Sequence, residues 1–220
     1  QFYPSVNHEI IKSFLDRDIK NKDIKYLIYR LIDTYEQGLC IGSYLCQYLA
    51  NYYLSYAYHY ITEMLFVERR RKRQNLVHHA LFYMDDIILF GSNKKHLKMA
   101  INEFETYLKN KLDLKLKPTY QLFPLNSRPI DMMGYKIYTY KTTVRKRIFS
   151  RANKVFIRCK GKNEISLEDS YKIVSYYGYF KHTYNKKYIK KVKLNKSIDL
   201  AKEVISNESK SNVQREATWL

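Results

Sequence analysis

Apolar residues near the start of the chain recur every three or four positions, which is the spacing of one face of a helix. Two such runs, at 6–15 and 23–34, predict amphipathic helices. A third helix is expected from Ser43, as its N-cap, to about residue 65. The segment 68–73 then interrupts the pattern with one Glu and five consecutive Arg and Lys residues, which predicts an exposed loop.

Residues 79–90 form two short β-prone apolar runs with polar residues only between them. This pattern predicts a buried hairpin whose tip carries Asp85 and Asp86. Adjacent carboxylates at a fixed tip suit a hard cation such as Mg²⁺, which binds one or two carboxylates together with water and substrate phosphates. The alternative interpretation is that two Asp residues only satisfy the turn itself.

A helix capped near Ser92 should follow the hairpin, and short strands are expected around 114–117, 120–123 and 134–138. Beyond about residue 148, Lys-rich helical segments replace the strand pattern. Helices and strands in this order indicate an α+β fold. We expect two domains, residues 1–147 and residues 148–220.

The chain is strongly basic, with 40 Lys and Arg residues against 21 Asp and Glu residues and a net charge of +19. Such an excess favours a polyanionic partner, nucleic acid before a membrane surface, although a solvated basic surface without a partner is the alternative. The chain shows no apolar run of about 20 residues and no signal-peptide pattern. Its three cysteines form no C-x-x-C pair. We therefore expect a cytoplasmic protein with no membrane partner.

Five segments resemble, in the same order, the motifs of the reverse transcriptase family. The first, residues 1–6, resembles the end of the motif that contributes the first catalytic Asp. Tyr3 stands where that family uses an aromatic gate against the ribose 2′-hydroxyl. The resemblance places the missing Asp before Gln1, so the chain by itself is expected to be inactive.

The second segment, 37–47, is similar to the loop and helix that contact the template and the incoming nucleotide, which implies nucleotide-binding roles for Ile41, Gly42 and Gln47. The third, 83–86, resembles the metal-binding hairpin of the family. It implies that Tyr83 and Met84 contact the nucleotide. Both Asp residues of this motif would be catalytic metal ligands.

The fourth segment ends at 114–117, where relatives carry a lysine slightly further on, at the position that aligns with Tyr120. This leaves open which group protonates the leaving pyrophosphate. The fifth, 130–135, looks like the turn that grips the primer terminus, through Met133, Gly134 and Tyr135.

The resemblance implies a right-hand polymerase palm in residues 1–147, with most of the fingers missing, and a helical basic thumb with a C-terminal tail in residues 148–220. It implies an RNA-directed DNA polymerase that uses two Mg²⁺ or Mn²⁺ ions, with an RNA template, a DNA primer and dNTPs as partners. Residues expected to contact the template–primer backbone are Lys117, Lys146, Arg147, Arg151, Lys154 and Arg158.

The second motif also bears on the subfamily. Ile41 precedes its Gly and Gln47 closes it after a Cys, which resembles the enzymes of diversity-generating retroelements. That similarity implies an accessory protein of the retroelement and errors concentrated opposite template adenines. The alternatives are an intron maturase-like enzyme, a phage-defence reverse transcriptase and a non-catalytic RNA-binding palm.

Overall fold

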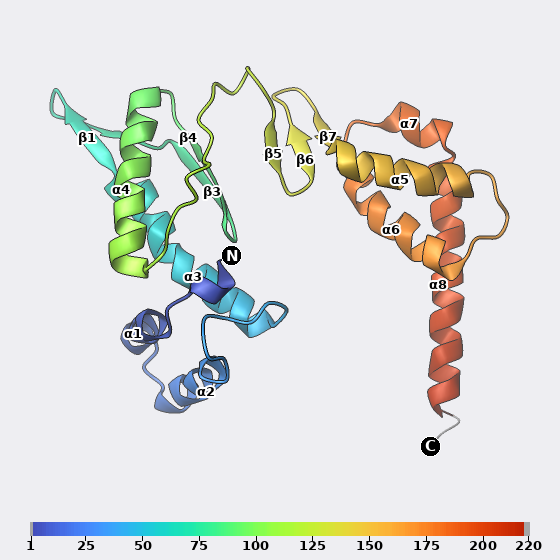
Figure 1. The fold of residues 1–220 in the computed structure, drawn as a ribbon, viewed down its shortest axis with the longest axis horizontal. Helices are drawn as coiled ribbons and strands as arrows, with labels where there is room; N and C mark the ends of the chain where they lie inside the picture. The colour runs from blue at the N-terminus through green and yellow to red at the C-terminus, as the bar shows by residue number, and fades with distance from the viewer. Residues whose placement is uncertain (1, 218–220) are drawn as a thin grey trace. The chain divides into compact units, whose positions relative to one another are not determined.

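The computed structural model describes residues 2–217, with side chains to residue 210. Gln1 of the first predicted motif and the last three residues of the predicted tail lie outside this range. Helices and small antiparallel sheets form two compact units, Gln1–Leu122 and Phe123–Leu220 (Figure 1). The α+β class is therefore confirmed. No helix in the described range has both the length and the apolar character needed to cross a membrane.

Helices carry most of the first unit, and two antiparallel hairpins complete it. Its elements in chain order are the 3-10 helix η1 (Tyr3–Ser5), α1 (His8–Asp18), α2 (Lys22–Ile32), α3 (Tyr44–His59), the π-helix η2 (Tyr60–Met64), β1 (Phe66–Arg69), β2 (Lys72–Asn75), β3 (His79–Tyr83), β4 (Asp86–Phe90) and α4 (Lys94–Leu112). Asparagine side chains cap α1, α2 and α4 by accepting backbone N–H bonds at the first turn. Ser43 occupies the N-cap of α3, as predicted, but its side chain makes no capping bond.

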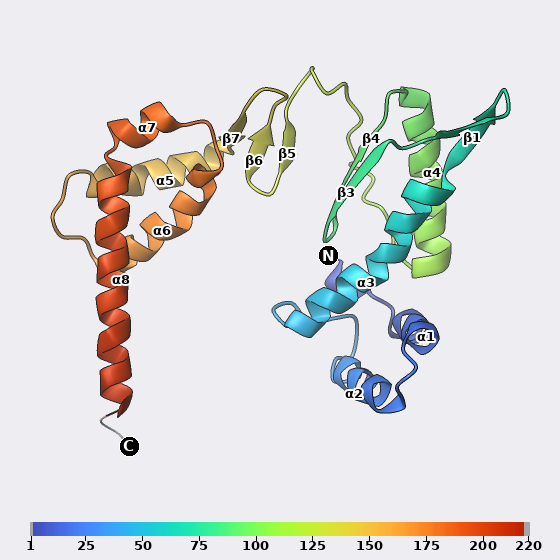
Figure 2. The ribbon, with the colours of Figure 1, turned by 180° about the vertical axis from the view of Figure 1, so that it is seen from behind.

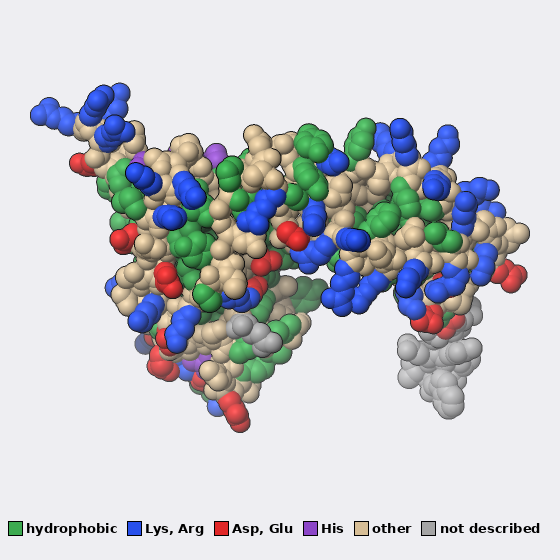
Figure 3. Space-filling view, turned by 45° about the horizontal axis from the view of Figure 1, so that its top comes forward, with side chains coloured by type: hydrophobic (Ala, Val, Ile, Leu, Met, Phe, Trp, Pro, Cys, Tyr) green, Lys and Arg blue, Asp and Glu red, His purple; other side chains and the backbone are tan. Residues whose placement is uncertain are grey.

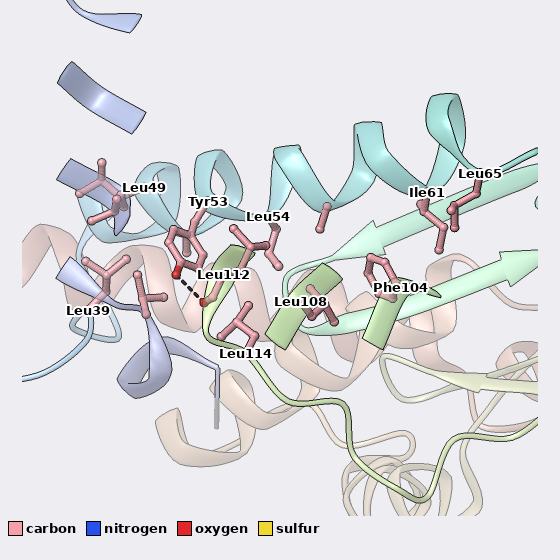
Figure 4. Close-up of a cluster of buried hydrophobic side chains, with 14 of the residues drawn as sticks. Leu39, Leu49, Tyr53, Leu54, Ile61, Leu65, Phe104, Leu108, Leu112 and Leu114 are labelled. Carbon is pink, nitrogen blue, oxygen red and sulfur yellow. Dashed lines mark hydrogen bonds between the residues drawn. The ribbon is translucent and has the colours of Figure 1, made fainter. Parts of the chain in front are cut away.

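The core of the first unit lies between α3, α4 and the β3–β4 hairpin. Tyr53 of α3 is fully buried, and its hydroxyl donates a hydrogen bond of 2.6 Å to the carbonyl of Leu112 at the end of α4 (Figure 4). Phe104 of α4 packs edge-on against Phe82 of β3, with ring centroids 6.1 Å apart. The first contact joins α3 to α4, and the second attaches the β3–β4 hairpin to α4.

The second unit places a small sheet beside four helices. Its elements are β5 (Ile130–Met132), β6 (Tyr135–Ile137), β7 (Thr142–Val144), α5 (Lys146–Cys159), α6 (Leu167–Lys181), α7 (Lys186–Lys191) and α8 (Leu194–Ala217). Phe156 and Phe180 are fully buried between the helices, with ring centroids 5.2 Å apart. The sheet is bonded to this helical part: the Arg145 N–H donates to Gly134, and the Tyr184 N–H donates to Thr142.

Those bonds explain why the expected boundary after residue 147 differs from the division into compact units after Leu122. The sheet that we assigned to the first domain packs with the helices of the second unit.

Two local predictions are wrong. Residues 68–73 are part of the β1–β2 hairpin and not a loop, with Glu68 paired to Arg73 and Arg69 paired to Lys72. Residues 114–117 and 120–123, within the described chain, form no strand because no neighbouring segment pairs with them. By contrast, the strand expected at 134–138 is present as β6 and pairs with β5 and β7.

Candidate active site

An acidic turn joins β3 to β4. Tyr83 pairs with Asp86 at the end of the ladder, which leaves Met84 and Asp85 at the tip. Met84 has a φ of 52°, a left-handed conformation that is uncommon for a non-glycine residue and is often found at functional sites. Both Asp side chains are exposed. The predicted hairpin with an acidic tip is thus present, with Asp85 in the turn and Asp86 as the first residue of β4. It is not buried as expected, because its strands have side chains that are half-buried or exposed.

Tyr3 lies against this turn, although 81 positions separate it from Met84 in the chain. Its hydroxyl is 3.5 Å from the Met84 sulfur and donates to it. Burial raises the pKa of the Tyr3 phenol, and nearby Cys46, Asp85 and Tyr83 raise it further. Tyr3, the segment 37–47 and the acidic turn therefore meet at one place.

Gly38 allows the second motif to pack closely on the backbone of Tyr3 and Pro4. The Leu39 N–H donates to the Tyr3 carbonyl at 2.8 Å, and the His8 ring Nε2 lies 2.6 Å from the Gly38 carbonyl oxygen. Gly38 has a φ of +66°, and a Cβ at this residue would lie 2.4 Å from the Tyr3 carbonyl oxygen and 2.5 Å from Pro4 Cα. Backbone packs directly on backbone here, and a side chain would separate the two motifs.

The other predicted residues of the second motif face solvent. Ile41 is 73% exposed in the turn before α3, so it is not a packing residue of the described chain. Gly42 follows it with a φ of +104° and open space around its Cα. Gln47 is exposed in the first turns of α3. The described contacts do not join these three residues to the acidic turn.

A pocket of about 680 Å³ lies on the acidic turn, between it and the chain that leaves α4. Its lining residues are Phe2, Ser5, Leu54, Asp85, Asp86, Ile87, Leu108, Asp113, Leu114, Lys115, Leu116, Lys117, Thr119 and Tyr120. The predicted nucleotide-binding residues are not among these lining residues.

The pocket brings in residues that sequence reasoning assigned differently or missed. Lys117, predicted to contact the template–primer backbone, lines it, and so does Tyr120. Lys115 and Asp113 also line it and were not predicted as site residues. The alternation of Leu and Lys over 114–117 was the available signal, because it puts both lysines on one side of an extended segment while Leu114 is buried.

The donor set at the turn fits a hard divalent cation. Asp85 and Asp86 are both exposed and line the same pocket. In the described part of the chain, no three His, Cys, Asp or Glu side chains gather into a larger metal-binding group. Mg²⁺ needs only one or two carboxylates when water and substrate phosphates complete its shell. Two Asp carboxylates are therefore enough protein ligands for a Mg²⁺ site of this kind. The binding of two ions stays a prediction.

The predicted primer grip forms a tight turn in the second unit. Met133 and Gly134 connect β5 to β6 with φ values of 51° and +86°. A Cβ on Gly134 would lie 2.7 Å from Ile148 Cδ1 and 2.9 Å from Tyr179 Cε1, so the turn packs closely on α5 and α6. Burial, and then the neighbouring Tyr179, raise the pKa of Tyr135. The turn is present, and its contact with a primer stays a prediction.

A basic face runs along α5. Arg147, Arg151 and Lys154 are exposed on one side of the helix, opposite the buried Ala152 and Phe156. Residues 123–220 hold 22 Lys and Arg against eight Asp and Glu. Figure 3 shows many of these cationic side chains on the visible face of the second unit. This surface suits a polyanion.

Lys146 and Arg158 were also predicted to contact the template–primer backbone, and their charges have different surroundings. Lys146 is exposed at the start of α5. Arg158 is also exposed, but its guanidinium forms a forked ion pair with Asp169 of α6, with Nε 3.1 Å from Oδ2. Hydrogen bonds from Arg158 lower the pKa of Asp169 below its ordinary value. Arg158 therefore joins α5 to α6, and its charge is compensated within the unit.

Comparison with known proteins returns no family, since no protein-family model matches the chain and no curated protein matches it.

Proposed function

We propose that this chain is the palm and thumb of an RNA-directed DNA polymerase, which extends a DNA primer on an RNA template. The observation that carries the proposal is that three segments far apart in the chain lie together. They are Tyr3, the loop that leads to Cys46, and the acidic turn with Met84 and Asp85. These are the segments that resemble three successive motifs of the family. Their convergence is what a shared active site requires.

Asp85 is the principal metal ligand in this proposal, and Asp86 assists it more weakly. The bound cations would neutralise the triphosphate and activate the primer 3′-hydroxyl toward the α-phosphate. Lys115 and Lys117, in the same pocket, are placed to add positive charge beside the phosphates. The Tyr3 hydroxyl is engaged with the Met84 sulfur, which holds its ring beside the turn, where it would limit the space for a ribose 2′-hydroxyl.

The enzyme is proposed to be of the diversity-generating retroelement type. Ile41 can offer only apolar contact where other relatives offer a polar side chain, and polar groups discriminate between substrates better than apolar shape. Its 73% exposure leaves it accessible to a bound template or nucleotide. An accessory protein of the retroelement would complete this system.

The proposal is tested by primer extension with the full-length protein on an RNA template. We expect DNA synthesis with dNTPs in Mg²⁺ or Mn²⁺, complete loss of synthesis in EDTA, and recovery when either ion is restored. A DNA product that forms equally well in EDTA would contradict the metal-dependent mechanism. A protein that binds the template–primer but makes no product under any of these conditions would support the non-catalytic alternative.

A further inference from the structure

The end of the β1–β2 hairpin is a concentrated basic surface in the first unit. Its exposed cationic residues are Arg69, Arg70, Arg71 and Lys72. Arg73 is different, because its guanidinium covers the Phe66 ring at 3.9 Å and donates to the carbonyl oxygen of Glu63. Glu68 stands opposite Arg73 in the ladder. Within the described residues, no acidic side chain forms an ion pair with the four residues of the hairpin end.

The hairpin end is built at a cost to folding. Arg70 and Arg71 have φ values of 52° and 59°, in a two-residue turn where Gly and Asn are strongly preferred. Arg69 lies directly across the ladder from Lys72, and like charges in that arrangement repel. Strained or repulsive arrangements that a fold retains often serve a function other than stability.

The base of the hairpin is fixed in the core. Leu65, Leu76 and Val77 are buried, and the Leu76 N–H donates to the Leu65 carbonyl at 3.0 Å. The unit therefore holds the strands at their base while their basic end remains in solvent.

The hairpin projects away from the acidic turn in both ribbon views (Figures 1 and 2). Leu54 of α3 lines the pocket of the acidic turn, and the helix continues from there to Met64, roughly 15 Å further on. The four residues of β1 add about 13 Å. The basic end thus lies far outside the pocket that holds Asp85.

We propose that the end of the β1–β2 hairpin is a second RNA-binding surface, which holds backbone phosphates at a distance from the polymerase site. The inference rests on the proposed function for the identity of the polyanion as RNA. Arginine guanidinium groups bind phosphate oxygens in pairs of hydrogen bonds, and such contacts do not depend on base sequence. The hairpin end, residues 69–72, contains only Arg and Lys, so it lacks the apolar anchor that membrane-binding segments insert beside their charges.

The test is an Arg70→Asn/Arg71→Gly variant of the full-length protein. This pair is the preferred sequence for the turn, so it should not weaken the hairpin, while it removes two charges. The probe is a labelled, single-stranded 30-nucleotide RNA, followed by fluorescence anisotropy in EDTA without dNTPs. We expect about a tenfold loss of affinity at low salt, and a salt dependence (log affinity against log salt) that is shallower by about 1.4.

Two controls isolate the role of the hairpin charges. Arg70→Lys/Arg71→Lys keeps both charges and should keep most of the salt dependence. Lys20→Gln/Lys22→Gln removes two exposed charges, one before α2 and one at its first residue, away from the hairpin, and should leave RNA affinity within about twofold.

The results also separate the alternatives. Unchanged RNA affinity and salt dependence in Arg70→Asn/Arg71→Gly would overturn the proposal. Self-association of that variant with unchanged RNA affinity would show that the charges keep the open strand edges from pairing with another chain. Loss of binding to phosphatidylserine vesicles with unchanged RNA affinity would show that the surface is a membrane contact. Because the assay needs neither metal nor synthesis, a positive result stands even if the protein proves to make no DNA.

Discussion

Asp85→Asn in the full-length protein is expected to lower RNA-templated DNA synthesis by at least about 10³-fold. The substitution keeps the size of the side chain and removes the charge that would hold the cation. RNA affinity should stay within about twofold, because an exposed carboxylate at the tip contributes little to binding a polyanion. Single-turnover primer extension and RNA anisotropy on the same preparation measure the two effects.

Two matched variants define how specific that loss is. Asp86→Asn should reduce synthesis less than Asp85→Asn, since Asp86 begins β4 and Asp85 occupies the turn. Glu105→Gln removes one exposed carboxylate from α4 in the same unit and should leave the rate nearly unchanged. Substantial synthesis by Asp85→Asn would show that the acidic turn is not the catalytic site.

Gly38→Ala is expected to give the largest loss of stability among single substitutions in the site. The new methyl group would meet the backbone of Tyr3 and Pro4 at 2.4–2.6 Å, and backbone atoms cannot rotate away as a side chain can. The loop must therefore shift, at a cost of about 2–4 kcal/mol from overpacking and the left-handed backbone together. Urea unfolding measures the cost, and primer extension should show a parallel loss of rate.

Gly42→Ala is the control for that result. It lies in the same loop at a φ of +104°, so its backbone strain is at least as large, but a Cβ there meets open space. We expect it to destabilise the protein by about 1–2 kcal/mol, less than Gly38→Ala. Equal losses in the two variants would mean that backbone strain alone matters and that the contact with Tyr3 does not hold the site together.

The sequence predicted the elements whose burial follows a regular pattern. The periodic apolar residues of α1 and α4 face the core, as with Ile11 and Phe104, both fully buried. In α2 the same spacing predicted the helix, but only Ile32 of its apolar residues is buried, and Leu27 is 60% exposed. The β3–β4 hairpin was also predicted, because two short apolar runs flank the adjacent Asp85 and Asp86.

The missed elements lack that signal. Both strands of the β1–β2 hairpin are almost wholly exposed, so no alternation of apolar and polar residues marks them. The segment 114–117 does alternate, but a strand also needs a partner, and pairing is a long-range property that local sequence does not specify. The division into compact units differs from the expected domain boundary, since it depends on which helices the small sheet packs against.

The candidate site was predicted in part. Family resemblance singled out Tyr3, Met84 and Asp85, and the structure brings them together. Asp113 and Phe2 were not predicted as site residues, although Phe2 stands next to Tyr3 in the first motif. They line the pocket only because the end of α4 and the start of the chain converge there.

The central claim is that the acidic turn holds the metal ions of a polymerase. Its most direct test is to count bound Mn²⁺ by electron paramagnetic resonance in a stalled complex of the full-length protein, an RNA template, a chain-terminated DNA primer and the next dNTP. We predict two ions per complex, and fewer in Asp85→Asn although the nucleic acid remains bound. The same number of ions in both proteins would contradict the account.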